Sequence, residues 1–149
     1  MHNSISVLNN LIEILKDGQE GFKASANDVE SPELKRVFNE YSLQRSGFAG
    51  ELQALVVSLG ESKPQTEGSV AGALHRGWIN LKSALASRDA HAILAECERG
   101  EDSAVANYRE ALEDADLPSN LRAILEKQLA AVKAAHDRVR MLRDSLAPK

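Results

Sequence analysis

Residues 31–60 read SPELKRVFNEYSLQRSGFAGELQALVVSLG and predict one long helix with both of its ends marked. Ser31 can cap the first turn, and Pro32 fits there because that turn needs no N–H from it. Gly60 suits the left-handed conformation that ends many helices. Between these ends, apolar residues recur every three or four positions, as on one helical face: Leu34, Val37, Phe38, Tyr41, Phe48, Leu52, Leu55, Val56 and Leu59. Such a face needs partners along the full length of the helix.

Three other segments have the same periodicity and predict those partners, at about 4–29, about 89–115 and about 118–146. The connections near 30 and 116 are short, so each joins two helices into an antiparallel hairpin. The segment between the hairpins, about 60–88, is long enough to travel the length of a bundle. One long crossover is the topology of ferritin-like folds, so we expect an all-α, ferritin-like four-helix bundle.

The crossover carries a further prediction of its own. Residues 61–69 contain Pro and Gly without periodicity and predict a loop, and about 69–86 predict a short fifth helix with Trp78 on its apolar face. We expect Trp78 to anchor this helix onto the bundle. The alternative is an interaction surface for an oligomer or partner, because Trp and Arg are enriched at interface hot spots. That surface would consist of His75, Arg76, Trp78 and Ile79.

Composition bounds the class of protein. The chain has 149 residues, which fits a single domain over 1–149, and a formal net charge of -4 with both signs interspersed. That balance gives no electrostatic footprint for nucleic acid or an anionic membrane, and no apolar run reaches the length of a membrane span. Cys97 is the only cysteine, so an intramolecular disulfide is excluded. We expect a cytoplasmic protein.

Several stretches resemble a bacterial family of ferritin-like four-helix-bundle proteins that is catalogued as a domain of unknown function. The resemblance covers nearly the whole chain. It implies the fold, but that family has no established activity or cofactor, so it implies no catalytic residue. The stretches that carry it are Lys16–Phe22, Gln44–Arg45, Phe48–Gln53, Gly68–Lys82 and Cys97–Asp102.

Polar side chains on the apolar faces are the candidates for function, because burying a polar group is costly. On a helical wheel, five of them fall within the apolar arcs: Gln19, Arg45, Glu101, Gln128 and His136. Glu51 lies near an edge of its arc. Glu20, Glu96 and Glu98 are expected to lie largely outside.

This set does not match a di-iron carboxylate site. Such a site takes one Glu from each of two helices and a Glu-x-x-His from each of the other two. Aligning the two predicted hairpins places Gln19 and Glu101 at the single-Glu positions, so one of the two is an amide. Residues 32–59 contain no histidine, and the guanidinium of Arg45 would repel a metal ion.

We therefore expect Arg45 and Glu101 to face each other across the bundle, where a metal pair would otherwise lie. Gln19, Tyr41 and Gln128 could satisfy the remaining donors and acceptors, which completes a central polar cluster. The alternative is that Arg45 extends to solvent and Glu101 lies at the edge of a groove, as long charged side chains often do.

These observations favour a non-enzymatic ferritin-like protein without a cofactor, which acts as a homo-oligomer or through a protein partner. The analogy with ferritin-like proteins suggests a role in stress. The competing hypothesis is a divergent oxidoreductase or iron-handling protein that binds iron or manganese through Glu51, Glu101 and His136. Cys97 lies on the inward arc of its helix, where a thiol is inert, and a redox role would require it to be exposed.

Overall fold

The computed structural model of the chain describes residues 2–60 and 77–146. Its helices run from α1 to α5 in chain order: α1 His2–Asp28, α2 Pro32–Ser58, α3 Leu81–Ser87, α4 Ala90–Leu112 and α5 Ser119–Asp144. The four long helices have the bounds that the periodicity predicts, to within a few residues.

The helix ends follow local chemistry. The Ser31 hydroxyl accepts a hydrogen bond from the Leu34 N–H at 3.2 Å, which caps α2 behind Pro32. Asp89 caps α4 in the same way, because its carboxylate accepts a hydrogen bond from the His91 backbone N–H at 3.0 Å. Gly60 adopts φ 104°, the left-handed conformation expected after α2.

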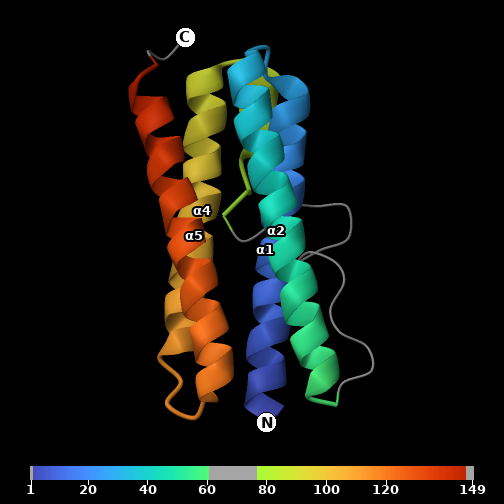
Figure 1. Cartoon of the computed structure of the whole chain (residues 1–149). Coiled ribbons are helices and arrows are strands. Elements are labelled where there is room, and N and C mark those ends of the chain that lie inside the picture. The colour runs from blue at the N-terminus through green and yellow to red at the C-terminus, as the bar shows by residue number, and fades with distance from the viewer. Residues whose placement is uncertain (1, 61–76, 147–149) are drawn as a thin grey trace.

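Two hairpins, α1 with α2 and α4 with α5, form the bundle, and α1 packs against α4 to join them. The end of α2 and the start of α4 lie at opposite ends of the bundle (Figure 1). The connection between them therefore traverses its length, and the predicted one-crossover topology is confirmed. No helix in the part of the chain that the structure describes is long and apolar enough to cross a membrane.

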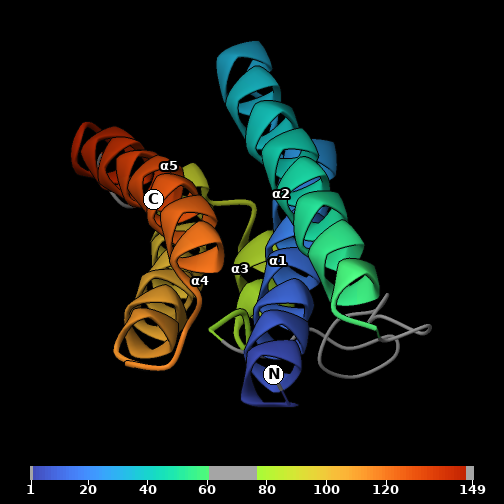
Figure 2. The same ribbon diagram turned by 60° about the horizontal axis from the view of Figure 1, so that its bottom comes forward.

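The crossover differs from its prediction. Residues 77–80 form turns, and the helix begins only at Leu81. Gly77 has φ 103°, and a Cβ there would lie 2.8 Å from the Ser103 Cβ, so the backbone passes too close to α4 to continue as a helix. The earlier part of the expected helix, with His75 and Arg76, lies outside the described residues. The helix α3 packs on α4 and α1 (Figure 2).

Trp78 lies in a slot between two helices. Its side chain is only 3% exposed, and the indole packs against Gly21 of α1 and Gly100 of α4, where any Cβ would overlap the ring. The Phe22 ring meets it edge-on, with centroids 5.2 Å apart. Trp78 is therefore an anchor and is not available to an interaction surface, whereas Ile79 is 65% exposed.

The core is divided into two apolar clusters by a polar layer. One cluster contains Leu8–Leu15 of α1 together with Leu52 and Tyr108, and the other contains Phe22, Tyr41 and Cys97. On three of the long helices a polar or glycine position falls between the two clusters: Gly18 of α1, Arg45 of α2 and Glu101 of α4. Because it holds buried charged side chains, this layer is the first candidate for a functional site.

Candidate functional site

Arg45 and Glu101 form an ion pair in the polar layer. Arg45 extends from α2 and Glu101 from α4, and the two guanidinium NH groups lie 2.5 and 2.6 Å from the two carboxylate oxygens. Each side chain is only 1% exposed. The two residues thus face each other as expected, and the alternative in which Arg45 extends to solvent is wrong.

The rest of the guanidinium is also engaged. Its Nε donates to the Gln44 side-chain oxygen at 3.1 Å, and its Cζ lies 5.4 Å from the centroid of the Phe22 ring, within cation–π range. Gly18 of α1 lies beside the arginine stem, where an added Cβ would be 3.7 Å from Arg45, an ordinary contact distance. Three helices therefore enclose the pair.

Many ferritin-like bundles hold a di-metal centre between their helices. The residues in this polar layer do not fit a di-metal centre. Both oxygens of Glu101 already accept from Arg45, which places a fixed positive charge at the centre. A second cation there would be repelled at short range in a medium of low dielectric constant. The bundle centre therefore does not suit a metal pair.

The expected partners of this pair are arranged differently. Gln128 belongs to a separate group: the Tyr108 hydroxyl donates to its Oε1 at 2.6 Å, and its Nε2 donates to Glu51 at 2.7 Å. Burial raises the pKa of the Tyr108 phenol well above its ordinary value, so it stays a donor. Tyr41 is buried with its ring 5.5 Å from that of Phe22. The Gln19 Oε1 has no hydrogen-bond partner among the described residues.

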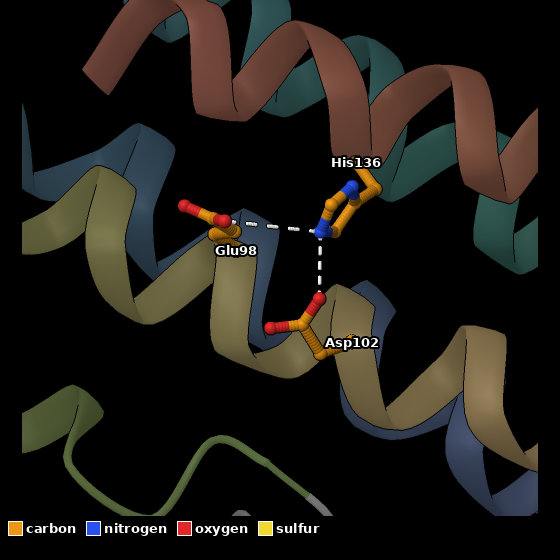
Figure 3. Close-up of side chains that lie close together, drawn as sticks. All are labelled: Glu98, Asp102 and His136. Carbon is orange, nitrogen blue, oxygen red and sulfur yellow. Dashed lines mark ion pairs between the residues drawn. The ribbon is translucent and has the colours of Figure 1, made fainter. Parts of the chain in front are cut away.

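A third polar group joins α4 to α5 at His136. The His136 Nε2 lies 2.6 Å from an Asp102 oxygen and 3.8 Å from a Glu98 oxygen (Figure 3). The His136 Nδ1 lies 3.0 Å from an Asp137 oxygen. Arg143 contacts the other oxygen of Glu98. Glu51 and Glu101 bond to Gln128 and Arg45 instead, so the described structure does not bring together the alternative metal site of Glu51, Glu101 and His136.

The pKa of His136 reflects opposing effects. Desolvation by itself would lower this pKa, but the hydrogen bond to Asp137 and the charges of Asp102 and Glu98 outweigh it. The net result is a pKa above the ordinary value for histidine. Sequence reasoning chose His136 but missed Asp102, although the spacing of Glu98 and Asp102 by four residues places both on one face of α4.

The position of Glu96 differs from its prediction. The helical wheel placed it largely outside the apolar arc, but its side chain is buried, at 3% exposure. Its carboxylate accepts a hydrogen bond from the Asn80 N–H at 2.7 Å and lies 3.6 Å from the Arg99 guanidinium. The segment before α3 covers this face of α4, which a wheel of α4 alone does not reveal. Glu96 thus helps to hold the crossover in place.

Cys97 is fully buried beside Ser25, whose hydroxyl lies 3.6 Å from the sulfur. Burial raises the pKa of the thiol far above its ordinary value, so the reactive thiolate is suppressed. A redox function for Cys97 in the folded chain is not supported.

We expect Cys97 to resist alkylation in the native state. Iodoacetamide at pH 8 should leave the folded protein unmodified over a time in which the same protein in guanidinium is fully labelled, as followed by mass spectrometry. Native labelling as fast as denatured labelling would show that the sulfur is accessible.

Comparison with known proteins gives a family and a fold. The family described as "Domain of unknown function (DUF2383)" matches residues 3–114. No curated protein matches the chain. Among solved structures, a Dps1 mutant from Mycobacterium smegmatis is similar with a TM-score of 0.79, over 95% of this chain and 95% of that chain, at 15% sequence identity. At that identity the likeness shows the fold alone, and the expected ferritin-like bundle is confirmed.

Proposed function

The chain belongs to the family described as "Domain of unknown function (DUF2383)", whose name gives no activity, and we propose its function from the geometry. We propose that the protein is a non-enzymatic, ferritin-like bundle that acts by assembling with copies of itself. The observation that supports assembly is an unusual stripe on the outer side of α2. It consists of Leu43, Gly47, Gly50, Ala54 and Val57, and all five are exposed.

The spacing of this α2 stripe is that of a helix-packing seam. Its residues are separated by four, three, four and three positions, the heptad spacing that keeps a row facing a partner helix. Leu43 is 74% exposed and Val57 is 53% exposed, which leaves apolar surface in water at both ends. Among the described helices α2 packs mainly on α1, and the five stripe residues stay exposed.

The two glycines of the stripe are not required by packing within the described part of the chain. A Cβ on Gly47 or Gly50 would meet nothing within 4 Å, although glycine inside a helix costs roughly 0.5–1 kcal/mol relative to alanine. Small residues at a helix crossing allow two backbones to approach closely. The stripe therefore suits close contact with another helix.

A second copy of α2 is the occupant that fits best. If two α2 helices cross antiparallel about a two-fold axis between Gly47 and Gly50, Leu43 of one copy faces Ala54 of the other, and each Gly47 faces a Gly50. Leu43 then meets a small residue, the glycines allow the two backbones to approach closely, and Val57 lies opposite Glu40 at each edge of the contact. The same surface serves both copies, as a two-fold contact requires.

The test is the mass in solution. Light scattering should give the wild type at least twice the chain mass of 16.2 kDa, and Leu43→Glu should give a single chain, because two buried carboxylates per contact would be unpaired. The matched control is Met141→Glu, which changes another exposed apolar residue, at 69% exposure, away from the stripe. A wild type that is monomeric, or a Leu43→Glu variant that keeps its mass, would contradict assembly through α2.

The competing function, an iron or manganese oxidoreductase with its metals in the bundle, is disfavoured by the ion pair of Arg45 and Glu101. The proposal of a non-enzymatic role is supported by that closed centre and by the inert environment of Cys97.

A further inference from the structure

The polar group that joins α4 to α5 contains an imidazole, a ligand type that the central pair of Arg45 and Glu101 does not offer. Glu98, Asp102 and His136 each offer one ligand atom, and these atoms lie within 4.8 Å of one another. Figure 3 shows both carboxylates of α4 directed towards the imidazole of α5. This group is separate from the bundle centre, where a ferritin-like di-metal site would lie.

The surroundings of the imidazole leave one position to fill. Its Nδ1 lies 3.0 Å from Asp137, and its Nε2 lies between Asp102 and Glu98. Both ring nitrogens therefore face carboxylate oxygens, but a neutral imidazole has a single N–H. The Nε2 atom is buried and has no hydrogen bond of normal geometry in the described part of the chain. Its environment favours a positive charge at this position, which either a proton on Nε2 or a bound metal ion can supply.

We propose that His136, Asp102 and Glu98 bind a divalent transition-metal ion, with Nε2 and one oxygen from each carboxylate as ligands. One imidazole with carboxylates is a ligand set that suits zinc and its neighbours in the first transition row. Asp137 acts as a positioning residue, because a carboxylate on Nδ1 holds the ring with its Nε2 lone pair towards the metal. Water completes the coordination.

The distances are close to what coordination needs. Two ligands at 2.0–2.2 Å from a tetrahedral ion lie roughly 3.4 Å apart, and the observed separations from Nε2 are 2.6 Å and 3.8 Å. Asp102 must therefore move outward slightly, and it can, because its side chain is 62% exposed. Glu98 and His136 are held more firmly, at 13% and 14% exposure.

The charges nearby set the strength of the site. Arg143 contacts the Glu98 oxygen that does not face His136, so one oxygen remains for the metal. Lys133 and Arg140 of α5 and Arg109 of α4 line a hollow beside Asp102 and His136. These cations weaken binding of calcium or magnesium, which rely on charge, more than binding of a metal that bonds to imidazole.

The experiment is a calorimetric titration of Zn²⁺ into tag-free protein after treatment with a chelator. We expect one Zn²⁺ per chain, at least tenfold weaker binding in Asp102→Asn, and none in His136→Ala. Asp102 is exposed, so its variant should fold normally. His91→Ala is the control, since it removes an imidazole from the start of α4, and it should bind as the wild type does.

Absence of Zn²⁺ binding by the wild type would mean that a proton fills the position, and would overturn the proposal. Undiminished binding by His136→Ala or Asp102→Asn would also overturn it. Neither result bears on assembly through α2, which the solution mass tests separately.

Discussion

Replacing Glu101 with leucine will destabilise the bundle by about 3–5 kcal/mol, the largest effect that we expect from a single polar substitution in this chain. The change leaves the guanidinium of Arg45 buried at 1% exposure with its charge uncompensated and with two of its donors unpaired. Chemical denaturation, followed by circular dichroism, measures the loss of unfolding free energy.

The double variant Arg45→Met/Glu101→Leu distinguishes the pair from ordinary packing. Removing both charges removes the desolvation cost as well, so this variant should recover most of the loss and could exceed the wild type in stability. Glu40→Gln is the control, because Glu40 and Arg138 form an exposed pair at 3.9 Å that is worth well under 1 kcal/mol. A Glu101→Leu variant within about 1 kcal/mol of the wild type would contradict a buried, paired Arg45.

Gly100→Ala will destabilise the protein by about 1–3 kcal/mol, although alanine is the better helix former. The added Cβ overlaps the Trp78 indole, which packs directly on Gly100, so either the ring or α4 must move. Trp78 is the only tryptophan in the chain, so its fluorescence reports the movement. We expect a red-shifted emission maximum together with a lower denaturation midpoint.

Gly18→Ala is the matched control for this substitution. Gly18 lies inside α1 as Gly100 lies inside α4, but a Cβ on Gly18 would lie 3.7 Å from Arg45, an ordinary contact. This variant should gain up to about 1 kcal/mol from helix propensity and keep the emission of the wild type. Equal effects of the two substitutions would show that Trp78 does not fill a slot at Gly100.

Periodicity and capping chemistry predicted the four long helices because each of them buries one continuous face. Ser31, Asp89 and Gly60 mark helix ends through contacts within a few residues, which sequence alone can show. The facing positions of Arg45 and Glu101 were predictable for a related reason: both interrupt an apolar face at a comparable distance from the helix ends.

Contacts that depend on register between helices could not be predicted. Gln128 was expected near Arg45 but bonds to Tyr108 and Glu51, because a helical wheel gives direction around a helix and not height along its neighbours. Glu96 is covered by the crossover, whose path depends on the left-handed Gly77. The apolar periodicity around Trp78 indicated a helix where close contact with α4 requires a turn.

The central claim is that an arginine and a glutamate occupy the middle of this ferritin-like bundle in place of a metal pair. The most direct measurement is a crystal structure of the tag-free protein grown with Mn²⁺, with anomalous scattering to locate the ion. We predict no anomalous peak beside Glu101, and two hydrogen bonds from Arg45 to that carboxylate. A peak ligated by Glu101, with the Arg45 side chain turned out to solvent, would contradict the claim.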